Sequence, residues 1–434
     1  MADEMGLGKT LQTIALLLDA KEQGKSTPSL VVCPTSLVLN WESDIRRFAP
    51  DLSVLSIIGS AEPREELLRS CGRYDVILTS YDMLKRDVAL YAGRRFAYHI
   101  LDEAQYIKNP HTQNARAVKA IASNQRFALT GTPIENRISE LWSIFDFLMP
   151  GFLYSYSRFR SQFESPILRD GDDVAREQLR RLVEPFILRR LKQDVLQELP
   201  PKTEQVLLVP LNEEQRQLYA ANLAQARQQV QIPGTNKMAV LALLTRLRQL
   251  CCDPALCYED YRGGSAKLDS CMELLRQGVE NGHKILVFSQ FTSLLDLLQK
   301  QLSREHMRFY RLDGSTPKEQ RATSIEAFNR DDTPVFLISL KAGGTGLNLV
   351  GADTVIHFDP WWNLAAQEQA TDRAHRIGQT RPVQVIKLIA KDTVEERILQ
   401  LQERKQGLAD ALIPTGEGLA GMTAEELRAL LEQG

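Results

Sequence analysis

Short apolar runs alternate with amphipathic stretches through the first 150 residues, and the same alternation returns between residues 284 and 389. Runs such as 29–34 (SLVVCP) are rich in β-branched residues, so each predicts a buried strand that ends in a polar loop. Helical spacing, as in 37–48 (LVLNWESDIRRF), separates most of the runs. Buried strands separated by helices indicate parallel sheets covered on both faces. The predicted strands are 29–34, 74–80, 98–104, 126–132, 284–290, 308–314, 334–340, 353–359 and 383–389.

The chain is therefore predicted to fold as two α/β lobes joined by a helical connector. Residues 151–264 differ from both lobes, because they are rich in Arg, Gln and Leu at helical spacing and end in a hinge-like YRGGS. A length of 434 residues also fits more than one domain. The predicted domains are a first lobe over 1–150, a connector with an insertion over 151–264, a second lobe over 265–421, and a C-terminal helix or tail over 422–434 that Thr423 and Glu426 cap.

The composition is that of a soluble globular protein, with 25% charged and 43% hydrophobic residues. A net charge of −2 neither indicates nor excludes a polyanionic partner, since a basic surface can exist within a neutral average. The sequence has no apolar run near the roughly 20 residues of a membrane span and no basic signal-peptide start, so we expect no membrane partner. Cys251, Cys252 and Cys257 lack a second ligand pair, which favours reduced thiols in an intracellular protein over a structural metal.

Residues 3–10 (DEMGLGKT) carry the glycines, lysine and threonine of a phosphate-binding loop. In such a loop, backbone N–H groups at a helix N-terminus surround one anion, the lysine reaches the β- and γ-phosphates, and the threonine hydroxyl binds Mg²⁺. Asp3 stands where the strict pattern has glycine, and only Met1 and Ala2 precede a loop that normally follows a strand. An ordinary glycine turn is the alternative. The candidate nucleotide-binding residues are Gly6, Leu7, Gly8, Lys9 and Thr10.

Two further patterns suit phosphoryl transfer. A predicted strand ends in Asp102 and Glu103, where P-loop enzymes place a metal-holding and a water-activating carboxylate, although a solvated pair at a strand end is the simpler alternative. Gln369, Arg373 and Arg376 are spaced i, i+4 and i+7, so on a helix they share one face. Such arginines can stabilise charge on the γ-phosphate in the transition state, but most surface arginines are only solvated.

Seven segments follow one another in an order that carries more information than any one of them. They are DEMGLGKT, VVCPTSLVLNWESDIRRF, ILDEAQYIKN, LTGTPIEN, ILVFSQF, AGGTGLNLVGADTVIHFDPWWN and QATDRAHRIGQ. The set resembles the motifs of superfamily 2 helicase-type ATPases, and specifically those of Swi/Snf-type DNA translocases. Residues 186–204 resemble the segment that joins the two lobes in that family, and 244–256 resemble its connector helix, which makes the cysteines structural.

The resemblance implies two RecA-like lobes that bind ATP and Mg²⁺ in the cleft between them, so that closure and reopening drive movement on DNA. It assigns catalysis to Lys9, Glu103, Arg373 and Arg376, and the metal to Thr10 and Asp102. The residues that resemble a coupling motif between nucleotide and DNA are Gln105, Thr130 and Thr132. Second-lobe residues that resemble nucleotide contacts are Gly346, Asn348 and Gln369.

The family tracks along double-stranded DNA without separating its strands, so the resemblance implies contacts to phosphates rather than to bases. Ser/Thr pairs at strand ends are also common helix caps, and the two tryptophans also suit a core. The candidate DNA contacts are Thr35, Ser36, Thr79, Ser80, Lys341, Gly344, Thr345, Trp361 and Trp362. The implied partners are duplex DNA and a DNA-bound protein complex as the target of remodelling.

Two other functions stay open on the sequence alone. The chain begins after the strand and the adenine motif that precede the loop in this family, so a truncated DNA-binding fragment with little ATP turnover is one alternative. A strand-separating helicase of the same superfamily is the other, although DPWWN and HRIGQ argue against it. We expect a cytoplasmic, nucleoid-associated protein if the source is bacterial, which the short connectors favour, and a nuclear one if it is eukaryotic.

Overall fold

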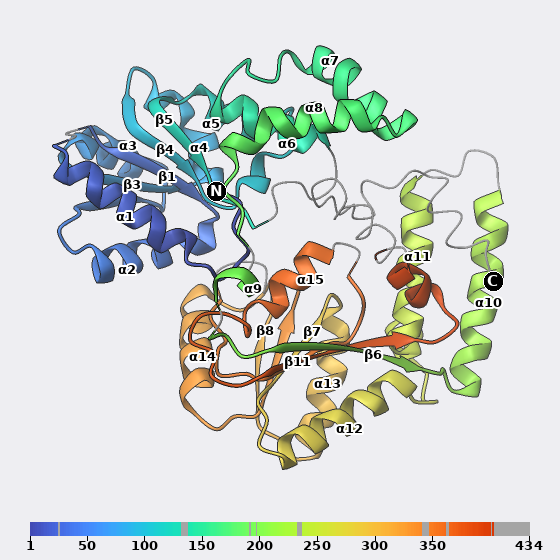
Figure 1. Ribbon diagram of the computed structural model, residues 1–434. Helices are drawn as coiled ribbons and strands as arrows, with labels where there is room; N and C mark the ends of the chain where they lie inside the picture. Colours follow the sequence, from blue (N-terminus) through green and yellow to red (C-terminus); the bar gives the residue numbers. More distant parts are fainter. Residues whose placement is uncertain are drawn as a thin grey trace. The chain divides into compact units, whose positions relative to one another are not determined.

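The computed structural model describes residues 1–24, 27–131, 138–190, 192–196, 198–231, 237–340, 347–361, 364–400 and 402. These residues form two compact units, unit 1 up to residue 196 and unit 2 from residue 198 onward. Each unit is built on its own sheet with helices around it (Figure 1). Thr132, Lys341, Gly344, Thr345, Gly346, Trp362 and the predicted tail 422–434 lie outside the described residues.

The sheet of unit 1 has five parallel strands in the order β2-β3-β1-β4-β5. The central strand β1 is buried along its whole length, as its apolar sequence predicts. β2 has four residues and a mixed burial pattern, and it was not predicted. The strands are β1 Ser29–Cys33, β2 Val54–Ile57, β3 Val76–Ser80, β4 Arg95–Leu101 and β5 Ala122–Ala128.

Helices cover both faces of this sheet, because successive side chains of a strand point to opposite faces. Val31 and Cys33 pack with α1 and α2 on one face, whereas Leu30 and Val32 pack with α3, α4, α5 and α6 on the other. A separate apolar cluster joins α6, α7 and α8. The helices are α1 Lys9–Glu22, α2 Val38–Phe48, α3 Ala61–Ser70, α4 Tyr81–Asp87, α5 Gln113–Ala120, α6 Ile138–Leu148, α7 Tyr156–Phe159, α8 Asp173–Val183 and α9 Lys192–Val195.

The sheet of unit 2 has six parallel strands in the order β6-β11-β10-β7-β9-β8. Strand β6 at one edge was not predicted, because its first four residues are polar and most of the strand is exposed. It pairs with β11 over the full length of both strands, which lie side by side in Figure 1. The strands are β6 Lys202–Val209, β7 Ile285–Ser289, β8 Phe309–Leu312, β9 Val335–Ser339, β10 Thr354–His357 and β11 Val383–Ala390.

Both faces of the second sheet are also covered. Val287 packs with α12 and α13 on one face, and Leu286 packs with α14 and α15 on the other. The pair α10 and α11 packs against Ala390 at the end of β11. The helices are α10 Glu213–Gln231, α11 Lys237–Cys252, α12 Ala266–Glu280, α13 Thr292–Arg304, α14 Lys318–Arg330 and α15 Leu364–Thr371.

The predicted fold class is confirmed, since both units are parallel α/β sheets flanked by helices. The helical stretch 151–264 is divided between them, with α7 and α8 in unit 1 and α10 and α11 in unit 2. Among the described residues, no helix is both long enough and apolar enough to cross a membrane.

Candidate nucleotide and nucleic-acid site

The phosphate loop of unit 1 leads directly into a helix, as the motif requires. Helix α1 begins at Lys9, and Gly8 occupies the position before it with a φ of 75°. Gly6 has a φ of 87°, so both glycines adopt the left-handed backbone that other residues avoid. The Lys9 ammonium donates to the carbonyl oxygens of Asp3 (2.7 Å) and Glu4 (3.3 Å), which folds this side chain back over the loop. The helix N-terminus and the ammonium together suit an anion.

The LTGT segment lies directly beside the phosphate loop. The amide of Thr130 donates to the carbonyl of Met1 (3.1 Å), and the amino group of Met1 donates to the carbonyl of Ala128 (2.8 Å). A Cβ atom placed on Gly131 would lie 2.6 Å from Cγ of Met5, which is closer than real contacts allow. Glycine is therefore required at position 131 for this close approach.

Asp102 follows strand β4 and is held by four hydrogen bonds, one of which its backbone amide donates to the carbonyl of Val32 (2.8 Å). One carboxylate oxygen accepts the indole N–H of Trp41 (2.8 Å), and the other accepts the backbone N–H of Glu103 (2.9 Å). Its carbonyl accepts the hydroxyl of Tyr81 (2.8 Å). Burial, and then the neighbouring Glu103 charge, raise the pKa of Asp102 to about 7. The sequence interpretation missed Trp41 and Tyr81, because both read as ordinary core residues of a helix.

Glu103 has a backbone conformation that is rare for its residue type. Its φ of 52° and ψ of 57° lie in the left-handed region, and only 7% of the residue is exposed. A glutamate in this region carries a backbone cost of the order of 1–3 kcal/mol, and such strain clusters at functional sites. The conformation aims the side chain at Gln105 instead of leaving it solvated at the strand end.

A line of hydrogen bonds connects Glu103 to the LTGT segment. The amide nitrogen of Gln105 donates to the Glu103 carboxylate (2.8 Å), and the hydroxyl of Thr130 donates to the amide oxygen of Gln105 (3.1 Å). Thr130 is nearly inaccessible, with 4% of its surface exposed. The structure thus brings together three residues that were predicted for catalysis and coupling.

The polar residues at the ends of β1 and β3 differ in accessibility. Thr35 is half-buried and Ser36 is exposed, in the turn that follows β1. Thr79 and Ser80 are completely buried. The Thr79 hydroxyl donates to the carbonyl of Ile57 (3.3 Å), and the Ser80 hydroxyl accepts the amide of Met83 (3.3 Å) and caps α4. The cap that the sequence left open as an alternative is therefore present at Ser80.

In unit 2, the predicted helical face for Gln369, Arg373 and Arg376 is wrong. Helix α15 ends at Thr371, so only Gln369 lies on it. The carbonyl of Arg373 accepts the amide of Leu349 (3.0 Å), and the carbonyl of Ala374 accepts the side chain of Gln379 (3.0 Å). These carbonyls would otherwise continue the helix, so contacts with the neighbouring loop end it.

The two arginines themselves differ in exposure. Arg373 is buried, with 4% exposed, whereas Arg376 is half-buried and donates to the carbonyl of Leu347 (3.5 Å). Leu347 adjoins Asn348, which is exposed and whose carbonyl accepts the side chain of Asn329 (2.8 Å). Arg376 and Asn329 therefore contact the carbonyls of two adjacent residues, Leu347 and Asn348.

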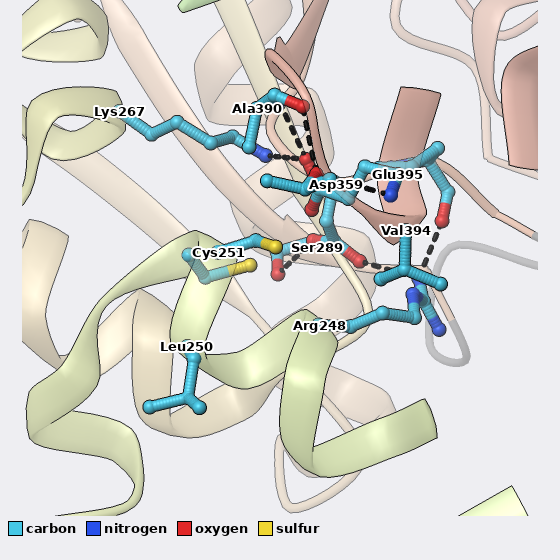
Figure 2. Close-up of polar contacts among 12 residues, drawn as sticks. Arg248, Leu250, Cys251, Lys267, Ser289, Asp359, Ala390, Val394 and Glu395 are labelled. Carbon is cyan, nitrogen blue, oxygen red and sulfur yellow. Dashed lines mark hydrogen bonds and ion pairs between the residues drawn. The ribbon is translucent and has the colours of Figure 1, made fainter. Parts of the chain in front are cut away.

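The DPWW segment is anchored by buried charges that the sequence interpretation missed (Figure 2). Asp359 accepts the hydroxyl of Ser289 (2.5 Å) and pairs with Arg248 of α11 (3.4 Å), and Arg248 also donates to the carbonyl of Pro360. Lys267 of α12 pairs with Glu395 (2.7 Å), and both are fully buried. Ser289 and Arg248 fix the segment that leads to Trp361.

Trp361 is half-buried, packs against the apolar core under α14 and α15, and donates its backbone N–H to Gln367 (3.2 Å). All six cysteines lie among the described residues and are free thiols. The described part of the chain also contains no group of three or more His, Cys, Asp or Glu residues placed to hold a metal ion.

Comparisons with known proteins identify the family of the chain. The SNF2-related domain matches residues 1–256, and the helicase conserved C-terminal domain matches residues 266–378. The putative ATP-dependent helicase/translocase YwqA of Bacillus subtilis is 40% identical over 99% of this chain and 48% of its own length. The uncharacterized ATP-dependent helicase MG018 of Mycoplasma genitalium is 39% identical over 100% of this chain and 42% of its own.

A mammalian protein has a similar sequence identity to this chain. Mouse SWI/SNF-related matrix-associated actin-dependent regulator of chromatin subfamily A member 1 is 38% identical over 96% of this chain and 41% of its own. The solved SWI2/SNF2 ATPase core of Sulfolobus solfataricus in complex with dsDNA is 39% identical over 100% of this chain and 92% of that one, with a TM-score of 0.47. The chain spans about half the length of the curated relatives it matches. This chain belongs to the family of SNF2-related, helicase-type proteins.

Proposed function

We propose that this chain is an ATP-dependent translocase on double-stranded DNA, which couples ATP hydrolysis to movement along the duplex and to remodelling of protein–DNA complexes. The observation that carries the proposal is the hydrogen-bonded line Glu103–Gln105–Thr130 beside the phosphate loop. Membership of the SNF2-related family supports it, because two relatives, YwqA and MG018, are described as ATP-dependent helicases.

The phosphate loop supplies the groups that grip a triphosphate. The backbone N–H groups of residues 6–10 lie at the N-terminus of α1, where partial positive charge favours an anion. Lys9 donates to two loop carbonyls, and we propose that it exchanges them for oxygens of the β- and γ-phosphates. These contacts hold the lysine over the loop.

The residues that would hold Mg²⁺ fit a hard cation. Asp102 offers a carboxylate whose orientation is set by Trp41 and by the amide of Glu103, and Thr10 at the start of α1 offers a hydroxyl. Magnesium prefers such oxygen ligands and usually completes its coordination with phosphate oxygens and water. When bound, it would neutralise the charge that develops on the transferred phosphoryl group.

Glu103 is proposed to orient and deprotonate the attacking water. Its strained backbone and its hydrogen bond from Gln105 hold the carboxylate in one position before substrate arrives. Thr130 reaches the same carboxylate through Gln105, so a shift of the LTGT segment changes the position of the base. Arg373 and Arg376 are proposed to supply positive charge at the γ-phosphate.

Duplex DNA is the proposed track, contacted through its phosphates. Thr35 and Ser36 lie at the carboxyl end of β1, the edge of the sheet that also carries Asp102 and Glu103. Hydroxyl and backbone N–H groups there suit sequence-independent phosphate contacts. The proposal therefore includes affinity for DNA that falls as salt rises.

ATP turnover with and without duplex DNA tests the proposal. We expect duplex DNA to stimulate hydrolysis by the native chain. Glu103→Gln should lower turnover about 10²- to 10⁴-fold with folding retained, because the amide cannot accept the proton. Arg376→Ala should lower it about 10³-fold or more. Glu66→Gln, the same change at an exposed residue of α3, is the matched control and should keep native turnover.

Two results would contradict the assignment, and a third would remove the support that the losses give it. Native turnover in Glu103→Gln or Arg376→Ala would refute their roles. A chain that binds DNA but neither binds nor hydrolyses ATP would show the alternative, a DNA-binding fragment without motor activity. An equal loss in Glu66→Gln would show that the assay reports general damage to the fold.

A further inference from the structure

Asp3, the residue that departs from the strict phosphate-loop pattern, faces an arginine far along the chain. One carboxylate oxygen accepts the backbone N–H of Arg190 (3.0 Å), and the other accepts Nε of its guanidinium (3.1 Å) and also Nη2. The Asp3 side chain is completely buried, and 37% of the Arg190 side chain is exposed. Arg190 thus contacts both oxygens of the buried carboxylate, one through its backbone N–H and the other through two N–H groups of its guanidinium, and hydrogen bonds between such charged groups are stronger than neutral ones.

Backbone contacts continue the attachment on both sides of Asp3. The amide of Ala2 donates to the carbonyl of Leu188 (2.7 Å), and the amide of Glu4 donates to the carbonyl of Arg190 (3.0 Å). The Glu4 carboxylate accepts the backbone N–H of Lys192 (2.7 Å). Residues 2–4 therefore run alongside residues 188–190 in the same direction, where the loop begins.

A second contact connects Arg190 to the interior of the loop. Its Nη2 donates to the amide oxygen of Gln12 on α1 (2.5 Å), and the Gln12 amide nitrogen donates to the carbonyl of Leu7 (2.9 Å). The carbonyl of Asp3, meanwhile, accepts the ammonium of Lys9 (2.7 Å). One guanidinium thus contacts the residue before the loop and, through Gln12, a carbonyl inside it.

We propose that Arg190 is a positioning residue for the phosphate loop, acting through Asp3 and Gln12 to hold the loop in the conformation that binds ATP. The inference rests on the proposed function, in which this loop grips the phosphates. Aspartate in place of glycine at position 3 is then an adaptation, because it gives the loop a charged attachment to residues 188–192. The segment that follows α8 is in this way part of the nucleotide site without touching the nucleotide.

Arg190→Gln is the central variant, with Arg189→Gln as its matched control. Arg189 is the adjacent residue, has the same charge and is exposed. ATP KM, kcat, the Kd of a fluorescent ADP analogue and the thermal midpoint without nucleotide are measured for each. We expect Arg190→Gln to raise both the KM and the analogue Kd about ten-fold or more, with a smaller change in kcat. Arg189→Gln should leave all four values native.

Two further variants separate positioning from a general effect on folding. Arg190→Lys keeps the charge but cannot contact Asp3 and Gln12 as a planar fork, so it should recover only part of the affinity. Gln12→Met removes the second contact and leaves the Asp3–Arg190 pair intact, so it should weaken nucleotide binding while the thermal midpoint stays close to native. It remains informative even if Arg190→Gln does not fold.

A double-mutant cycle tests whether Arg190 acts through Asp3. Asp3→Asn should raise the analogue Kd in the native background but have much less effect once Arg190 is already glutamine. If the fold-changes in the analogue Kd caused by Asp3→Asn and Arg190→Gln simply multiply in the double variant, the proposal is overturned. A native analogue Kd in folded Arg190→Gln and in Gln12→Met would overturn it too. A native chain that does not bind the analogue would instead refute the proposed function, so the two failures are distinguishable.

Discussion

Replacing Lys267 with methionine removes the cation from a fully buried ion pair in unit 2. Its ammonium lies 2.7 Å from the Glu395 carboxylate, and neither side chain has any exposed surface (Figure 2). Burial by itself lowers the pKa of Lys267, but Glu395 and other nearby groups outweigh it and the net pKa is raised. Lys267 is therefore charged at neutral pH, and Lys267→Met leaves the Glu395 carboxyl group in the core without its cation. Such a change costs about 3–5 kcal/mol.

Native-state hydrogen exchange, followed by mass spectrometry on peptides that contain β7 and β10, measures this loss within unit 2. A cost of about 3–5 kcal/mol corresponds to exchange that is faster by about two to three and a half orders of magnitude, because each 1.4 kcal/mol is tenfold. Arg276→Gln provides the control, since its pair with Glu305 is 45% and 31% exposed. That surface change should cost less than about 1 kcal/mol.

The double variant Lys267→Met/Glu395→Gln decides whether the charge is the cause. Glutamine keeps an oxygen that can accept the amide of Ala390, as Glu395 does at 2.9 Å, but it carries no charge. We expect it to recover more than half of the stability that Lys267→Met loses. If the double variant is as unstable as Lys267→Met, or if Lys267→Met costs under 1 kcal/mol, the reasoning about the buried pair is refuted.

Two other predictions concern unit 1. Gly131→Ala places a methyl group 2.6 Å from Cγ of Met5, so it should displace the phosphate loop. We expect a higher ATP KM and a loss of about 1–3 kcal/mol of stability. A native melting curve and a native KM would contradict this. Asp102 has a folded-state pKa of about 7 against an ordinary 3.8, so between these values the folded state takes up a proton that the unfolded chain does not. Without Mg²⁺, unit 1 should therefore gain stability, at most about 2.7 kcal/mol, as pH falls from 8 to 5, and Asp102→Asn should remove this slope in urea titrations. A native slope in that variant would assign the proton to another group.

The strands that the sequence predicts well are those buried on both faces. Their apolar runs are long and uninterrupted, as in β1 and β9, so no tertiary information is needed to find them. Strand β6 is not predicted because it is largely exposed and half of its residues are polar. It forms a strand by pairing with β11. Edge strands of this kind depend on a partner that is distant in sequence.

The site residues likewise divide into those that a local motif predicts and those whose contacts depend on residues distant in sequence. Lys9, Asp102, Glu103 and Thr130 belong to local motifs, and the structure places them on the elements that the motifs imply. The helix expected through Arg373 fails because contacts with Leu349 and Gln379 capture its carbonyls. Other contacts of the site, such as Asp3 with Arg190, join residues that are 187 positions apart, and neither residue type nor local spacing indicates such a pair.

Movement along intact duplex is the central claim, and displacement of a third strand from a DNA triplex measures it most directly. The native chain should release the third strand only with ATP and Mg²⁺, Glu103→Gln should release none, and neither should separate the strands of an ordinary duplex. Release of a duplex strand with ATP, or a native chain that hydrolyses ATP on duplex DNA without displacing the third strand, would contradict the account.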